Sequence, residues 1–221
     1  IKSYSANKKE EMMGLVFNGS KLTFFLMWVF SLPMLLEMEM ILTVWLKAPP
    51  IEAIFFTQLV IVESLIFSLS MPLATAARAP GKMALYELIL GSIQILIFFV
   101  SLWVLNLGYP VEWVFYVAIA ANVLMFKVRL LLVNYLIGLP IMRYYQKVVA
   151  PVVIVLIIST VLSMILSNLL PKNYYASILV ILSSMTISTL TMYFIGLNKH
   201  WRKKILTVLI NRLSKNKLKE I

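Results

Sequence analysis

Residues Val148–Leu170 read VVAPVVIVLIISTVLSMILSNLL, an apolar run without a single charged side chain. A helix needs about 20 such residues to cross the hydrocarbon core of a bilayer. This run is long enough and predicts a transmembrane helix. It decides the fold class, because one such span already places the chain at a membrane.

Five further runs of the same kind flank it, and each break between them carries Pro, Gly or Asn. Lipid cannot satisfy free backbone groups, and the runs are too long and too continuously apolar for barrel strands. The sequence therefore predicts an all-α, polytopic membrane protein with six transmembrane helices. We expect the spans at Leu22–Leu46, Ala53–Ala77, Met83–Leu107, Val111–Leu136, Val148–Leu170 and Tyr174–Leu197.

Composition supports this class and excludes others. Of the 221 residues, 62% are hydrophobic and 13% are charged, which is outside the range of soluble globular proteins. The chain has no Cys, no Asp and one histidine, His200. Thiolate metal sites, aspartate-rich metal sites and Ser-His-Asp triads cannot be built from these residues. We therefore expect no enzymatic activity, no metal and no cofactor.

Positive charge predicts the orientation in the membrane. The formal net charge is +11, and of the 20 Lys and Arg residues only Lys47 and Lys172 fall in the loops of one side. Basic residues concentrate on the cytoplasmic side of membrane proteins. We therefore expect cytoplasmic segments at residues 1–21, 137–147 and 198–221, with both ends of the chain in the cytoplasm.

Two of these segments have an interfacial pattern. In residues 198–221, apolar side chains recur every four positions from Trp201 beside several basic residues, as in a helix lying on an anionic leaflet. The stretch Ile141–Lys147 is a shorter version, and residues 137–147 are predicted as an interfacial loop. A basic helix exposed to solvent is the equal alternative for the tail.

Polar side chains at membrane depth are the candidates for function. A charge in the bilayer costs roughly 2.5 to 3.5 kcal/mol on insertion scales, so such groups usually face a bundle interior or a cavity. Glu63, near the middle of the second span, is the strongest candidate; helix packing through a protonated Glu63 is its alternative. Glu37 and Glu39 are less specific, because their helix could end early. The candidate residues for substrate binding or coupling are Glu63, Gln58, Gln94, Asn122, Lys127 and Arg129.

Several short stretches, in their order and spacing, resemble a known family. They are LVFNGSK at Leu15–Lys21, LPMLLE at Leu32–Glu37, ILTVWL at Ile41–Leu46, RLL at Arg129–Leu131 and IGL at Ile137–Leu139. With them, the chain resembles the C-terminal half of bacterial polysaccharide or O-antigen (Wzx-like) flippases. These belong to the multidrug, oligosaccharidyl-lipid and polysaccharide exporter superfamily, which includes the MATE transporters. The chain begins at Ile1 rather than Met, and we expect a fragment of a longer protein.

The resemblance implies two six-helix lobes that face each other across a cavity and open it to alternate sides. Residues 22–136 would be four helices of the C-terminal lobe, and residues 148–197 two additional helices. The implied substrate is a polyprenyl-diphosphate-linked oligosaccharide for surface polysaccharide such as lipopolysaccharide O-antigen. The implied location is the bacterial inner membrane, and the implied partners are this substrate, membrane lipids and the missing N-terminal half, without nucleic acid. Departures from the family pattern include Arg78, Gln58 and Phe67.

Two other functions fit the same residues less closely. A cation-coupled multidrug antiporter of the same superfamily would be expected to lack the last two helices. An integral membrane glycosyltransferase or polymerase would need catalytic groups in large outer loops, and the predicted outer loops are short.

The charge division makes the topology testable. Single cysteines at Ala48, Gly108 and Asn173 should react with an impermeant thiol reagent added outside intact cells, whereas cysteines at Ala79 and Gln146 should react only after permeabilisation. The chain has no native Cys to give background labelling. Labelling of the Ala79 position in intact cells would contradict the six-span topology.

Overall fold

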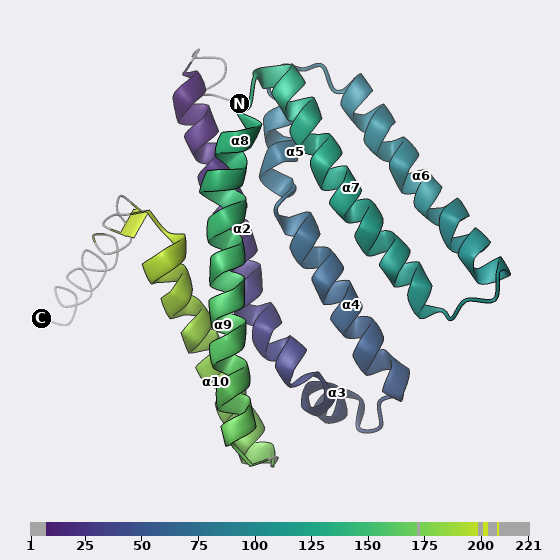
Figure 1. The fold of residues 1–221 in the computed structure, drawn as a ribbon, viewed down its shortest axis with the longest axis vertical. Helices are drawn as coiled ribbons and strands as arrows, with labels where there is room; N and C mark the ends of the chain where they lie inside the picture. The colour runs from purple at the N-terminus through teal and green to yellow at the C-terminus, as the bar shows by residue number, and fades with distance from the viewer. Residues whose placement is uncertain (1–7, 172, 199–200, 203–206, 208–221) are drawn as a thin grey trace, which may run out of the picture.

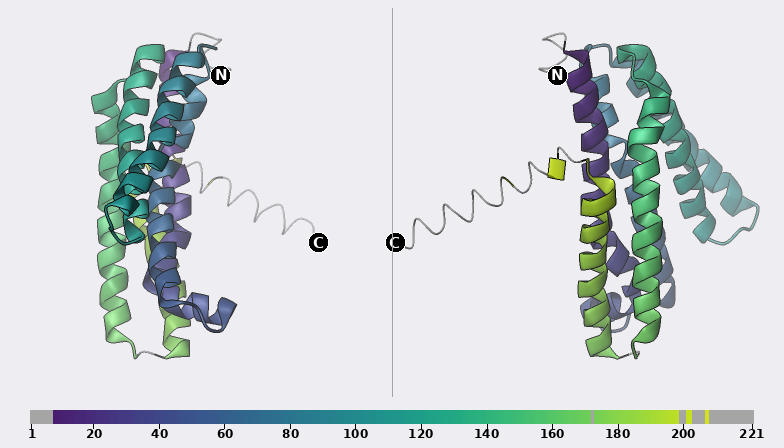
Figure 2. Two further views of the ribbon diagram at one scale, coloured as in Figure 1. Left: turned by 90° about the vertical axis from the view of Figure 1, so that its right-hand side faces the viewer. Right: turned by 60° about the vertical axis from the view of Figure 1, so that its left-hand side comes forward.

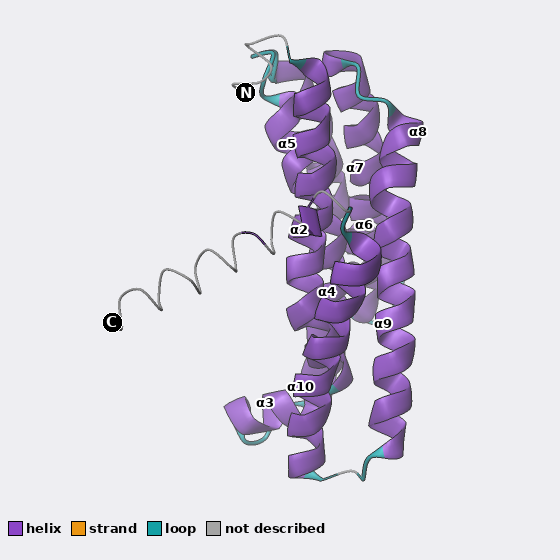
Figure 3. Cartoon of the chain, turned by 90° about the vertical axis from the view of Figure 1, so that its left-hand side faces the viewer, coloured by secondary structure: helices purple, strands orange, loops and turns teal. Residues whose placement is uncertain are grey.

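The computed structural model describes residues 8–171, 173–198, 201–202 and 207. These residues form helices joined by short connections, as Figure 3 shows, and no strand occurs among them. Six helical segments are long and apolar enough to cross a membrane. The predicted class is therefore confirmed: the protein is an all-α, multi-pass membrane protein. The six segments are Lys9–Leu36, Ile51–Ala77, Ala84–Asn106, Glu112–Ile137, Ile141–Leu169 and Tyr174–Gly196.

The first span differs most from its predicted limits. Helix α2 (Lys9–Leu36) begins well before Leu22, because nothing between Lys9 and Lys21 interrupts the helix. The prediction of a loop up to residue 21 is therefore wrong for residues 9–21, and residues 1–7 lie outside the described part. Lys21, expected in that loop, is buried at 2% exposure, and its Nζ lies 3.4 Å from the carbonyl oxygen of Gly196.

The first two predicted spans are each broken near a proline. Pro33 lies in the last turn of α2, which ends at Leu36, and a short helix α3 (Met38–Leu46) turns aside from the bundle, as Figure 2 shows. The second span is divided into α4 (Ile51–Ser68) and α5 (Met71–Ala77), with Pro72 in the first turn of α5. Pro72 has no backbone N–H to continue the hydrogen bonding of α4.

The predicted loop at residues 137–147 is mostly helical, which corrects that prediction. Helix α7 (Glu112–Ile137) ends at Gly138, whose φ of +72° suits glycine. The chain then runs through α8 (Ile141–Tyr144) and a π-helical turn directly into α9 (Ala150–Leu169). Pro140 precedes α8, as proline does at helix starts. The fifth span is thus one continuous helical segment that begins at Ile141.

Helix α2 holds the bundle together. It packs against α4 and α5 on one side and against α9 and α10 (Tyr174–Thr191) on another. Helix α7 packs against α4 and α5, and α6 (Ala84–Asn106) packs mainly against α7. The helices therefore follow the order α9 and α10, α2, α4 and α5, α7, α6 across the molecule in Figure 1. The last two helices adjoin the first one, far from α6.

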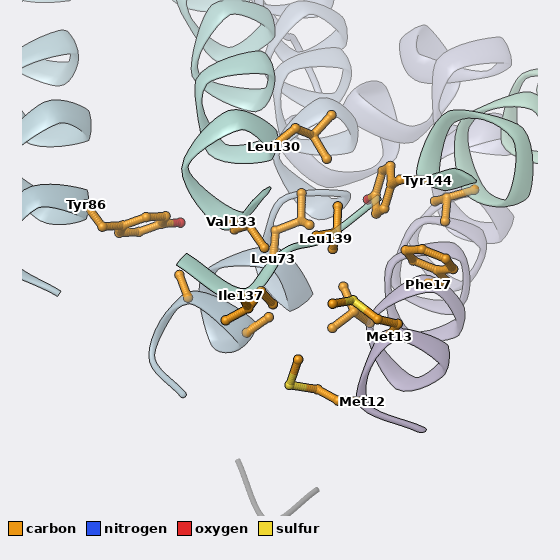
Figure 4. Packing of buried hydrophobic residues seen from close by; sticks show 14 of the residues in the cluster. Met12, Met13, Phe17, Leu73, Tyr86, Leu130, Val133, Ile137, Leu139 and Tyr144 are labelled. Atoms are coloured by element: carbon orange, nitrogen blue, oxygen red, sulfur yellow. The ribbon is translucent and has the colours of Figure 1, made fainter. Parts of the chain in front are cut away.

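Tyr144 belongs to the larger hydrophobic cluster, shown in Figure 4. Its side chain is fully buried, and its ring meets Phe17 edge to face at 5.6 Å. Its hydroxyl donates a hydrogen bond of 3.3 Å to the carbonyl oxygen of Leu69, in the break between α4 and α5. Burial of Tyr144 thus joins α2 and α8 and satisfies a carbonyl that the helix break leaves free.

Small residues let α2, α9 and α10 approach closely. Trp28 on α2 donates a hydrogen bond of 2.8 Å to the hydroxyl of Ser159, which is buried on α9. Gly196, after α10, lies so close to Phe25 that an added Cβ would be 2.5 Å from the ring. Contacts of this kind are typical of helix association in membranes, where packing replaces the hydrophobic driving force.

Gly196→Ala should therefore lower the thermal stability of the protein in nanodiscs, by about 1 to 3 kcal/mol for an overpacked contact. Phe25 is fully buried and cannot move aside freely. Gly91→Ala is the matched control, because no atom lies within 4 Å of its Cβ position. Adding Phe25→Leu to Gly196→Ala should recover part of the loss. Equal melting temperatures for the two alanine variants would show that the close contact does not exist.

Candidate functional site

Four of the six predicted site residues line one cavity between α4, α6 and α7. Glu63 comes from α4, Gln94 from α6, and Asn122 and Arg129 from α7. The cavity has a volume of about 260 Å³. We call it the polar groove; its lining residues are Glu63, Ser64, Phe67, Gln94, Asn122, Met125 and Arg129.

Three of these side chains lie near the middle of their spans. At a rise of 1.5 Å per residue, Glu63 is about 18 Å from the start of α4. Gln94 and Asn122 are each about 15 Å from the starts of their helices by the same measure. The polar groove therefore lies at the depth of the hydrocarbon core, where polar side chains are costly unless they have partners.

Glu63 and Asn122 are such partners. The Asn122 side-chain amide donates a hydrogen bond of 2.9 Å to Oε1 of Glu63, and it also donates to the carbonyl oxygen of Ala118 at 3.1 Å. Asn122 is buried and Glu63 is half-buried. A donating amide orients the carboxyl group whether or not that group carries a proton. The pair therefore joins α4 to α7 and still leaves Glu63 open to the groove.

Arg129 lies at one end of the polar groove. Its guanidinium carbon is 5.3 Å from the centroid of the Phe67 ring, within the range of a cation–π contact. Its Nε is buried and has no hydrogen-bond partner in the described part of the chain. Arg129 also lines a second cavity, next to the groove. The guanidinium therefore has unused donors at a place where a ligand has room.

The two remaining predicted residues lie elsewhere. Gln58 donates a hydrogen bond of 3.1 Å to the carbonyl oxygen of Leu35, near the end of α2, and so ties α4 to α2. Lys127 is exposed and does not line the polar groove. The structure thus brings together Glu63, Gln94, Asn122 and Arg129 and leaves Gln58 and Lys127 outside.

Glu37 and Glu39 lie in a different recess. Helix α2 ends at Leu36, so both carboxylates lie at one end of the bundle rather than within a span. They line a recess of about 640 Å³ together with residues of α9 and α10, including Asn168. Their place at a helix break agrees with the prediction that they are less specific candidates than Glu63.

Sequence reasoning missed the apolar and small residues of the groove, Ser64, Phe67 and Met125. A signal for two of them was present in helical spacing. Phe67 follows Glu63 by four positions, and Met125 follows Asn122 by three, so each pair shares a helix face.

Metal ligands do not gather in the described part of the chain: no group of three or more His, Cys, Asp or Glu side chains there could hold an ion.

Comparison with family models, curated proteins and solved structures gave no match. The residues of this chain are therefore the basis for inferring its function.

The Glu63–Asn122 contact can be measured by a double-mutant cycle. Glu63→Ala and Asn122→Ala should each destabilise the protein, and their combined loss should be smaller than the sum by about 0.5 to 2 kcal/mol. Unfolding in mixed detergent micelles gives the free energies. Asn122→Ala combined with Gln58→Ala is the control, because Gln58 bonds to α2, and these two losses should add. Additive losses for Glu63 and Asn122 would disprove their coupling.

Proposed function

We propose that this chain is the C-terminal part of a membrane transporter that flips a polyprenyl-diphosphate-linked oligosaccharide across the bacterial inner membrane. The observation that carries the proposal is the polar groove at membrane depth, with Glu63, Gln94, Asn122 and Arg129 on three helices. The sequence resemblance to O-antigen flippases supports the same substrate class. In this proposal the protein acts in surface polysaccharide biosynthesis and is not an enzyme.

The chemistry of the groove suits such a substrate. Carboxylate and amide groups exchange hydrogen bonds with sugar hydroxyls, because each hydroxyl both donates and accepts. The guanidinium of Arg129 pairs well with phosphate oxygens. Polar groups at membrane depth lower the cost of moving a hydrophilic head through the bilayer, while the lipid tail stays in the hydrocarbon.

Alternating access would give the groove its role. In this proposal the spans Lys9–Leu36 to Glu112–Ile137 form one side of a central cavity, and a second lobe forms the other side. The resemblance implies that this lobe belongs to the same protein. In this proposal both ends of the chain lie in the cytoplasm, the orientation that the distribution of positive charge favours.

A cation-coupled antiporter is the second candidate, and Glu63 is the observation that favours it. A carboxyl group near the middle of a span is suited to bind and release a proton or a cation during transport. A glycosyltransferase or polymerase is less well supported, because the connections at Leu107–Val111 and Leu170–Asn173 are short and most of the segment between the first two spans, residues 37–50, is the short helix α3.

Glu63→Gln, introduced into the full-length protein, tests the proposed role of the Glu63 carboxyl group. Gln keeps the size and the hydrogen bonding but cannot ionise. We expect normal abundance in the membrane and a loss of surface polysaccharide export of about tenfold or more, as for a functional ionisable group in a span. Glu39→Gln, the same change at the end of the bundle, should leave export unchanged.

Export is measured as surface polysaccharide in a flippase-deficient strain at matched membrane levels, between pH 6 and pH 8. Export by the Glu63→Gln variant at the wild-type rate across this range would show that Glu63 only packs helices. Drug efflux without polysaccharide export would favour the antiporter instead.

A further inference from the structure

A second cavity lies next to the polar groove and shares Phe67 and Arg129 with it. Its volume is about 200 Å³. It lies among α5, α6 and α7, where α5 ends and α6 begins. We call it the headgroup cavity; its lining residues are Phe67, Met71, Ala74, Thr75, Arg78, Tyr86, Glu87, Leu90 and Arg129.

Charges of both signs line the headgroup cavity without neutralising each other. Arg78 and Arg129 are cations, and Glu87 is an anion. The salt bridges in the described part of the chain are Lys8–Glu11 and Arg143–Glu10, so these three side chains form none within 4.0 Å. Opposite charges on the walls of one cavity favour a ligand that carries both charges itself.

Two donors in the same wall also lack partners. The hydroxyl of Tyr86 and Nε of Arg129 are buried without a hydrogen bond in the described part of the chain. Tyr86 is only 3% exposed. A buried polar group without a partner is costly, and an acceptor supplied by a ligand would remove this cost. Phosphate oxygens are strong acceptors of this kind.

The cavity lies at the depth of lipid headgroups. Arg78 directly follows α5, and Glu87 is in the first turn of α6, so both mark the ends of spans. Figure 1 shows the α5–α6 connection at the same end of the bundle as the start of α2 and the end of α7. Arg78 and Glu87 are both exposed there.

An apolar groove continues from the headgroup cavity along α5. It has a volume of about 410 Å³ and lies between α2 and α5. Met71 and Thr75 line both spaces, are one helical turn apart and are exposed. A ligand with a charged head and a hydrocarbon chain can therefore occupy both at once. The other lining residues of the apolar groove are Met12, Leu15, Val16, Thr23, Pro72 and Ala76.

We propose that the headgroup cavity binds the phosphoethanolamine headgroup of a membrane phospholipid, with an acyl chain in the apolar groove. The phosphate pairs with Arg78 and Arg129, and the primary ammonium donates hydrogen bonds to the carboxylate of Glu87. Choline has no N–H to donate, and glycerol has no cation to offset the repulsion between Glu87 and the phosphate. This inference does not depend on the proposed function, although Arg129 borders both cavities.

Native mass spectrometry of the delipidated protein tests this site. The protein is titrated in turn with dioleoyl phosphatidylethanolamine, phosphatidylglycerol and phosphatidylcholine, and with soluble phosphoethanolamine. We expect the ethanolamine lipid to bind about fivefold more tightly than the other two lipids, the advantage of one favourable ion pair near the surface. Soluble phosphoethanolamine should bind much more weakly, because it leaves the apolar groove empty.

Two variants test the contact to the lipid ammonium and the contact to the lipid phosphate separately. Glu87→Gln should make the affinity for the ethanolamine lipid about equal to the affinities for the other two lipids. Binding of the glycerol lipid should stay the same or rise. An unfolded protein cannot give this pattern. Arg129→Gln should weaken binding of all three lipids. Lys127→Gln, on the same helix but outside both cavities, is the control and should behave as wild type.

The outcomes decide the inference. Equal affinity for the three lipids in the wild-type protein, or an unchanged preference in Glu87→Gln, would overturn it. Preference for the glycerol lipid would show a simple anion site instead. Tight binding of soluble phosphoethanolamine would show that the ligand is a small zwitterion and not a lipid.

Discussion

Every backbone group inside a bilayer needs a partner within the protein, and this requirement explains the contacts at each helix break. Side chains bond to the carbonyl oxygens that the breaks leave free: Gln58 to Leu35, Tyr144 to Leu69, and Asn134 to Leu139. Pro72 and Gly138 lie at two of these breaks, and Pro33 lies in the last turn of α2 before the third. Polar side chains thus fix where the pieces of each span lie relative to their neighbours.

The central position of α2 follows from its small and aromatic surface. Ser20, Ser31 and Trp28 are buried on it, and Ser159 and Ser184 are buried on the helices that it meets. Small side chains allow backbones to approach, and the Trp28–Ser159 hydrogen bond fixes their alignment. By contrast, α6 has large exposed apolar side chains on most of its surface, as a lipid-facing helix does. Burial is therefore greatest on α2 and least on α6.

Arg129 links the two cavities that matter for function. On one side it borders the polar groove with Glu63 and Asn122, and on the other the headgroup cavity with Arg78 and Glu87. Its stacking on Phe67 holds the guanidinium between them. A ligand in either cavity would change the electrostatic field in the other, because a single cation is shared in a medium of low dielectric constant. We therefore expect the lipid environment to influence the polar groove through this residue.

The sequence alone determined the membrane class, the number of spans and the set of polar residues at depth, because the length and hydropathy of each run depend only on neighbouring residues. Four of the polar residues that it singled out line the polar groove. Only the tertiary structure decided that Glu63 meets Asn122, 59 positions away, while Gln58 on the same helix turns to α2. In lipid nearly every face of a helix is apolar, so the hydrophobic pattern does not indicate which face points inward. Close packing and hydrogen bonding between helices make that choice.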